Sequence, residues 1–123
     1  MFQLAVSHCS VPVWVLFNGL GVVGVTWNSK ILACKFLSAS GNGSDSDAIE
    51  CFNYILALKN RGINIRVTNN SWGGGGANPV MQTAIDQLGA AGVLNVFAAG
   101  NNGSNNDVIP FYPATLNSAS IVS

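Results

Sequence analysis

Few residues of this chain could carry out catalysis. The sequence holds one histidine, His8, together with five acidic residues and three cysteines. A histidine next to a serine or cysteine can act as the general base in nucleophilic catalysis, and His8 is the one histidine available for that role. Its setting, VSHCSVPVW, has no periodic pattern and no evident partner. These neighbours alone therefore do not indicate a catalytic site.

The acidic residues are better explained by helix capping than by a metal site or an acid–base pair. Asp45, Asp47 and Glu50 fall where a helix is expected to begin, and negative charge is favourable at helix N-termini. Asp86 lies off the apolar stripe of a second expected helix, where water would solvate it. No CxxC or Cys/His cluster is present, so zinc is not indicated.

Three loops rich in glycine and small polar residues are stronger candidates for a binding site. They are SASGNGSDS (38–46), NNSWGGGG (69–76) and GNNGSNND (100–107). Each follows an apolar run, and Gly and Asn also suit turns, so the local interpretation of each loop is only a turn. Their meaning depends on the elements that position them.

From residue 30 onward, strand and helix patterns alternate. Apolar runs at 30–37, 63–68 and 93–99 are typical of buried strands, and 118–123 begins a fourth. The segment 47–60 has helical periodicity, with Ser46 or Asp47 as its cap and one apolar side. That side contains Ala48, Phe52, Ile55 and Leu56.

A second helix is expected to begin at Pro79, with Asn78 as its cap, and to end at Gly92. Its apolar stripe follows the spacing i, i+3, i+4, i+7 and contains Met81, Ala84, Ile85 and Leu88. Alternating strands and helices with short connections predict an α/β fold, a parallel sheet flanked by helices. The three loops then leave the same edge of the sheet, where such folds bind ligands.

Composition limits the class of protein. The 123 residues suffice for one small domain, with 49% apolar residues and only 8% charged residues. Either Asn, Ser, Thr and Gly solvate its surface, or further protein covers part of it. The net charge of zero gives no reason to expect binding to nucleic acid or an anionic membrane. No apolar run approaches the roughly 20 residues of a membrane span, and the amino terminus lacks the positive start of a signal peptide.

Two further expectations concern the cysteines and the glycine run. Cys34 and Cys51 are expected to be buried free thiols, because cysteine packs as a small hydrophobic residue. The run Gly73–Gly76 could let a phosphate approach the backbone, which keeps a nucleotide-binding α/β domain as an alternative. No lysine or arginine lies near it, and no phosphate-loop motif is present.

Four further segments are informative together: 18–55, VTNNSWGG (67–74), FAAGNNG (97–103) and PFYPA (110–114). In this order they resemble the subtilisin-like serine protease family. The resemblance extends from Asn18 to Ser123. It implies a three-layer α/β/α fold, of which this chain holds part, and hydrolysis of peptide bonds by a serine endopeptidase.

The resemblance also implies roles for single residues. Asn101 would donate its side-chain amide to the oxyanion of the tetrahedral intermediate. An extended peptide substrate would pair with two backbone segments, as an added strand does. These segments and the wall of the primary specificity pocket contain Gly41, Asn42 and Gly43; Ser71, Trp72, Gly73 and Gly74; and Ala98, Ala99 and Gly100.

The family's Asp, His and Ser triad is not matched in this chain. The aspartate segment would precede residue 1, and the serine segment would follow Ser123. His8 lies near the family's spacing from Asn18, but its flanks differ from the family's histidine block. We interpret 18–123 as the central part of a peptidase domain, inactive alone. Residues 1–17 are unmatched and could come from a wrong reading frame or a misplaced start. The alternative is a non-catalytic peptide-binding pseudoenzyme.

The remaining expectations also follow from the resemblance. The chemistry needs no cofactor, but the full-length protein could hold a structural calcium ion. Asn18 would supply a side-chain oxygen, and Leu16, Leu20 and Val22 would supply carbonyls. The expected partners are an extended peptide or protein substrate and the remainder of the peptidase domain. The family is mostly extracellular or vacuolar, and three glycosylation sequons, at 42–44, 69–71 and 102–104, fit this location.

Overall fold

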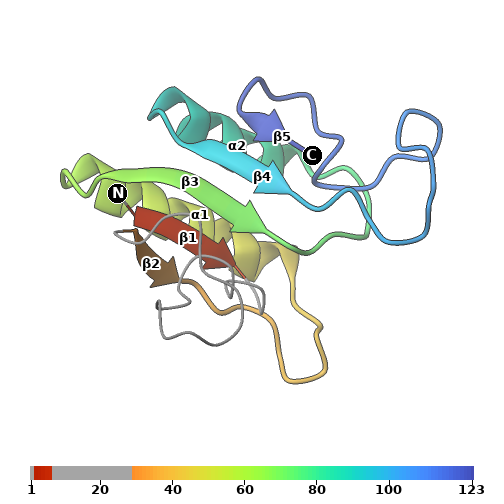
Figure 1. Ribbon diagram of the computed structural model, residues 1–123, viewed down its shortest axis with the longest axis horizontal. Coiled ribbons are helices and arrows are strands. Elements are labelled where there is room, and N and C mark those ends of the chain that lie inside the picture. The colour runs from red at the N-terminus through yellow and green to blue at the C-terminus, as the bar shows by residue number, and fades with distance from the viewer. Residues whose placement is uncertain (1, 7–28) are drawn as a thin grey trace, which may run out of the picture.

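The computed structural model describes the backbone of residues 2–6 and all of residues 29–123. The described residues form one five-stranded sheet in the order β2-β1-β3-β4-β5, and every neighbouring pair is parallel (Figure 1). The strands are β1 (Phe2–Val6), β2 (Lys30–Ala33), β3 (Ile65–Asn70), β4 (Leu94–Phe97) and β5 (Ile121–Val122). The helices are α1 (Asp45–Asn60) and α2 (Pro79–Ala90).

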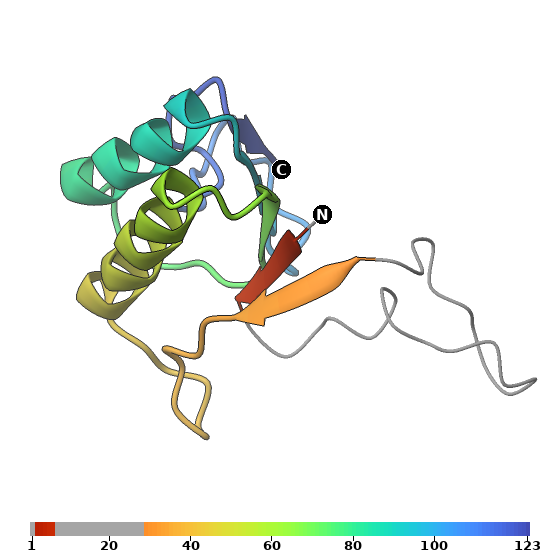
Figure 2. The same cartoon turned by 90° about the vertical axis from the view of Figure 1, so that its left-hand side faces the viewer.

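Both helices pack on the same face of the sheet (Figure 2). α1 connects β2 to β3, and α2 connects β3 to β4, so each helix forms the crossover between two parallel strands. This arrangement confirms the predicted α/β class. In the described part of the chain, helices cover one of the two faces of the sheet.

The helix caps agree with the sequence at α2 and differ at α1. The Asn78 side chain accepts hydrogen bonds from the amides of Val80 (3.0 Å) and Met81 (3.2 Å), as the predicted cap requires. For α1, the predicted caps Ser46 and Asp47 were wrong. The hydroxyl of Ser44 accepts from the Asp47 amide at 3.2 Å and the helix begins at Asp45, because serine satisfies a free amide there equally well.

The core lies between the two helices and the sheet. All four residues of the predicted α2 stripe are buried, and Ile85 and Leu88 are fully buried. From α1, Ala48, Phe52 and Ile55 pack into the same cluster, while Leu56 lies half-buried against it. The helical periodicity therefore predicted the packed faces of both helices.

The strand boundaries differ more from the expectations. The expected strand 30–37 is paired only as β2, from residue 30 to 33, and the expected strand 63–68 is paired as β3, from residue 65 to 70. β1 was not predicted, and it lies between β2 and β3. Apolar runs indicate burial, but pairing depends on partners that are distant in sequence.

The expectation of free thiols at Cys34 and Cys51 was wrong. The two cysteines form a disulfide, with their Cα atoms 6.1 Å apart. Cys34 directly follows β2, and Cys51 lies on the buried face of α1. The bond therefore attaches the chain that leaves β2 to the helix layer. Spacing alone could not predict it, because proximity between two cysteines arises only in the folded chain.

Candidate functional site

The carboxyl ends of the strands gather the three glycine-rich loops at one edge of the sheet. Because all strand pairs are parallel, the loops that follow β2, β3 and β4 leave the sheet in the same direction (Figure 1). This confirms the predicted convergence. β3 and β4 are direct neighbours, whereas β1 separates β2 from β3.

Two of these loops form the walls of one groove with a volume of about 300 Å³. One wall follows β2 and contains Phe36, Leu37, Gly41, Asn42, Gly43, Ser44 and Asp45. The other follows β3 and contains Trp72, Gly73, Gly74 and Gly75. Six residues predicted to bind substrate therefore line a single groove, and Ser71 lies exposed directly before the second wall.

An aromatic cluster positions the two walls. Trp72 packs edge-on against Phe36 of the opposite wall, with ring centroids 5.1 Å apart. It also packs against Phe52 of α1 at 6.4 Å and Phe97 at the end of β4 at 5.8 Å. Such pairs contribute about 0.5–1.5 kcal/mol each beyond area burial. Trp72 thus links both walls of the groove to the core.

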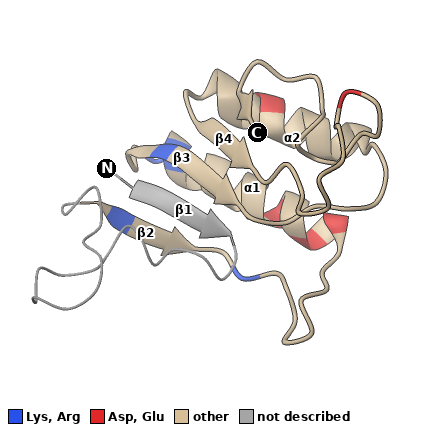
Figure 3. Cartoon of the chain, turned by 45° about the vertical axis from the view of Figure 1, so that its right-hand side comes forward, with Lys and Arg blue, Asp and Glu red and all other residues tan. Residues whose placement is uncertain are grey.

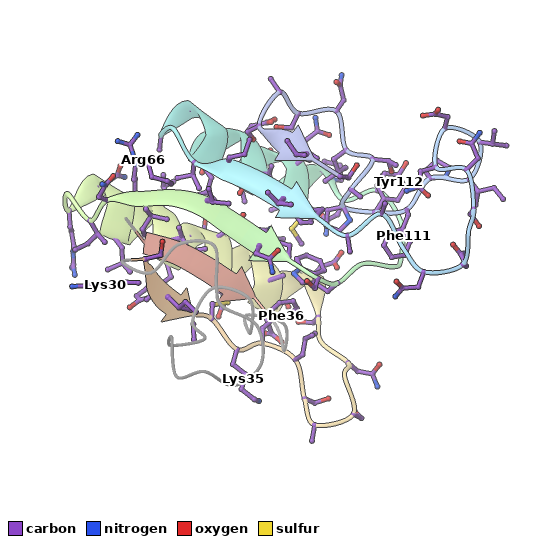
Figure 4. All side chains as sticks on the ribbon, in the orientation of Figure 1. Lys30, Lys35, Phe36, Arg66, Phe111 and Tyr112 are labelled. Atoms are coloured by element: carbon purple, nitrogen blue, oxygen red, sulfur yellow. A yellow bond between two sulfur atoms is a disulfide. The ribbon has the colours of Figure 1, made fainter. Side chains whose placement is uncertain are left out.

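The glycines of the second wall allow a close approach to a further segment, 110–114. The Gly74 amide donates to the Tyr112 carbonyl at 2.8 Å. A Cβ on Gly73 would lie 2.8 Å from that same carbonyl oxygen and would overlap the Phe111 ring. Phe111 and Tyr112 lie beyond the carboxyl ends of the strands and away from Phe36 (Figure 4). The peptide bond between Tyr112 and Pro113 is cis.

The segment around Asn101 follows β4. The Ala98 amide donates to the Asn70 carbonyl at 3.0 Å, which holds the chain beside β3 past the end of the strand. Gly100 has φ +102°, a conformation that L side chains rarely adopt. The Asn106 side chain donates to the Ala99 carbonyl at 2.8 Å and closes the loop. Asn101 is exposed on this turn.

Ala98, Ala99, Gly100 and Asn101 do not line the 300 Å³ groove. They lie at the end of β4, next to the strand that leads into the second wall. Ala98 and Gly100 are half-buried, and Ala99 is exposed. The structure thus places the predicted residues in two neighbouring groups along one edge.

A buried polar network, not predicted from the sequence, lies beneath this edge. The Thr68 hydroxyl donates to the Asn95 side-chain carbonyl at 2.7 Å, and the Asn70 amide donates to the Thr68 hydroxyl at 2.9 Å. All three side chains are at most 1% exposed. Buried polar groups are expected to be hydrogen-bonded, so this network supports the register in which Thr68 of β3 pairs with Asn95, near the beginning of β4.

Charge is sparse at the site. Among the described residues that line the groove, Asp45 is the only charged side chain. Acidic residues gather at the start of α1 (Figure 3), whereas Lys30 and Arg66 lie at the amino ends of their strands (Figure 4). Within residues 29–123, no three His, Cys, Asp or Glu side chains are grouped so that they could hold a metal ion. His8, Asn18 and the carbonyls of Leu16, Leu20 and Val22 fall outside the described residues.

The fold and the groove define an α/β protein with a cleft at the carboxyl edge of a parallel sheet. A model of the subtilase family matches residues 8–123. Subtilisin DY of Bacillus licheniformis is 34% identical over 113 residues, which cover 91% of this chain and 39% of that protein. Subtilisin-like protease 2 of Plasmodium falciparum is 29% identical over 114 residues, covering 89% and 8% respectively.

Among solved structures, the S41 psychrophilic protease is similar, with a TM-score of 0.71 and 29% identity. The match covers 85% of this chain and 33% of that protease. The chain belongs to the subtilase family and corresponds to part of its peptidase domain. It spans less than half the length of these relatives. No helix in the described residues is long and apolar enough to cross a membrane.

Proposed function

We propose that this chain is the segment of a subtilisin-like serine endopeptidase that carries the substrate cleft and the oxyanion-hole asparagine. The observation that supports this best is the groove between residues 41–45 and 72–75, with Asn101 on the adjoining loop of the same sheet edge. An extended peptide lying in the groove would pair with the exposed backbone of both walls. At Gly41, where an added Cβ would meet nothing within 4 Å, the absence of a side chain leaves the backbone open to this approach.

Asn101 would act on the developing charge of the intermediate. Peptide hydrolysis passes through a tetrahedral species whose oxygen becomes negative, and a fixed neutral donor stabilises that oxygen. Gly100 turns the chain after β4, and the Asn106 side chain donates a hydrogen bond to the Ala99 carbonyl. The loop backbone therefore sets the position of Asn101. Ala98, Ala99 and Gly100 would leave room beside it for the side chain that precedes the cleaved bond.

Alone, the chain would bind peptides without cleaving them. Its single histidine, His8, does not have the sequence context of the family's base, and no Gly-Thr-Ser-Met-Ala segment is present. Cleavage would require the remainder of the peptidase domain as a partner. Leu94 and Val122 support this need, because these apolar residues of β4 and β5 are 42% and 50% exposed. A nucleotide is disfavoured, because the groove holds a carboxylate.

The disulfide supports an extracellular or vacuolar location, since such bonds persist in oxidising compartments. Calcium remains a proposal for the full-length protein. Asn18 and neighbouring carbonyls would hold it, and its role would be structural.

Two measurements test this proposal. In ¹⁵N-labelled protein, an extended hexapeptide should shift the amide signals of Gly41–Gly43 and Trp72–Gly74. The same peptide with proline at alternate positions, which cannot pair as a strand, should not. A fluorophosphonate probe for activated serines should leave the chain unlabelled. Equal shifts with both peptides would rule out strand-like binding, and covalent labelling would rule out an inactive segment.

A further inference from the structure

We propose that Asp45 makes the groove selective for a peptide that places an arginine or lysine side chain beside it. This inference rests on the proposed function, because it assigns a substrate class to the same groove. It identifies Asp45, which the sequence pattern explained only as a helix-capping residue, as a specificity-determining residue.

The carboxylate of Asp45 is held in a defined position by α2. Asn78 uses its side-chain oxygen to cap α2, accepting from the amides of Val80 and Met81. Its amide nitrogen is therefore directed away from that helix, and it donates to Asp45 Oδ2 at 2.9 Å. A neutral donor orients the carboxylate without neutralising its negative charge. Asp45 is exposed and lines the groove.

The surroundings of Asp45 favour a cationic side chain. Among the described residues lining the groove, no basic side chain competes for the carboxylate. Lys35, on the same connection, donates to the Leu37 carbonyl at 3.0 Å and lines a different depression. Trp72 lines the groove opposite Asp45, and an indole is the aromatic group that attracts cations most strongly. A carboxylate and an indole that line one groove would together suit a guanidinium or ammonium group.

Asp47 provides a matched control. It also lies in the first turn of α1 and is exposed, so it has the same favourable interaction with the helix N-terminus. It lines the depression that contains Cys34 and Tyr54, not the groove. Asp47→Asn therefore reproduces the effect of Asp45→Asn on the helix without changing the charge of the groove.

The test uses the 123-residue chain and labelled hexapeptides, each carrying one arginine. The arginine occupies each position in turn, and every peptide has a counterpart with citrulline, which is neutral and nearly the same shape. Fluorescence anisotropy gives the dissociation constants at low salt. At one position of the arginine, the peptide should bind roughly 3- to 10-fold more tightly than its citrulline counterpart. This ratio is expected for one exposed ion pair and one cation–π contact.

The variants separate the causes of that preference. Asp45→Asn and Asp45→Ser should reduce the ratio to within about twofold, whereas Asp47→Asn should preserve it. Far-UV circular dichroism checks the folding of each variant. Equal binding of both peptides by the unsubstituted chain overturns this inference and leaves the proposed function standing. An arginine-to-citrulline affinity ratio that stays unchanged in Asp45→Asn also overturns this inference and leaves the proposed function standing. If no peptide binds in any register, both proposals fail.

Discussion

The Cys34–Cys51 disulfide provides the sharpest test of how the groove wall is held in place. The bond closes a loop with a sequence separation of 17 residues. Closing a loop of this length lowers the conformational entropy of the unfolded chain. This effect alone predicts that the disulfide stabilises the fold by about 3 kcal/mol. Small domains are stable by only about 5–15 kcal/mol, so its loss is a large fraction of the total.

The perturbation is the double substitution Cys34→Ala and Cys51→Ala. The midpoint of thermal unfolding, followed by circular dichroism in the absence of reductant, should fall by roughly 10–15 °C. Cys9→Ala is the control, because it removes the third cysteine and leaves the disulfide intact. Alkylation without reduction, followed by mass spectrometry, should leave Cys34 and Cys51 of the unsubstituted chain unmodified.

The disulfide also has a predicted effect on binding. Phe36 and Leu37 line the groove only two and three residues after Cys34, so losing the bond to α1 should loosen that wall. Peptide affinity should then fall together with stability. A midpoint within about 3 °C of the control would refute the entropic argument. Alkylation of both cysteines in the unreduced chain would refute the disulfide itself.

Two further predictions concern residues that support the site. Gly73→Ala should destabilise the chain by about 1–3 kcal/mol and weaken peptide binding, because the new Cβ would lie 2.8 Å from the Tyr112 carbonyl oxygen. In the control Gly76→Ala, the new Cβ meets nothing within 4 Å, so neither stability nor binding should change. Urea unfolding measures the stability, and peptide titration measures the binding. Thr68→Val should cost about 2–3 kcal/mol, because it leaves the buried side-chain oxygen of Asn95 without its donor and removes one of the two acceptors of the Asn70 amide nitrogen. Thr68→Ser keeps the hydroxyl and should recover most of this loss. Equal stability of the alanine variants, or of the valine and serine variants, would contradict these assignments.

The sequence predicted the parts of the fold that depend on local periodicity. The α2 stripe from Met81 to Leu88 and the Asn78 cap were both correct, because helix burial and capping are determined within a few residues. The parallel crossovers followed from the order of the elements. From these, the convergence of the three loops could be deduced before any coordinates were known.

What the sequence did not predict depends on contacts between distant segments. The pairing of Cys34 with Cys51, the position of β1 and the hydrogen bond from Thr68 to Asn95 all require the folded chain. Asp45 has two environments, the first turn of a helix and a groove wall, and only the first is visible in the sequence. The roles predicted for Asn101 and for the groove residues remain to be tested by experiment.

The two groups of site residues have different main anchors, and the contact between Trp72 and Phe97 connects them. The groove walls depend on the disulfide and on the packing of Trp72 against Phe36. The Asn101 segment depends on the hydrogen bond from Ala98 to β3 and on closure of its own loop. Breaking the disulfide should therefore weaken peptide binding more than it displaces Asn101, the proposed oxyanion donor. In the proposed peptidase, a substitution at Asp45 would then change the side chain that the groove selects and leave the loop that carries Asn101 in place.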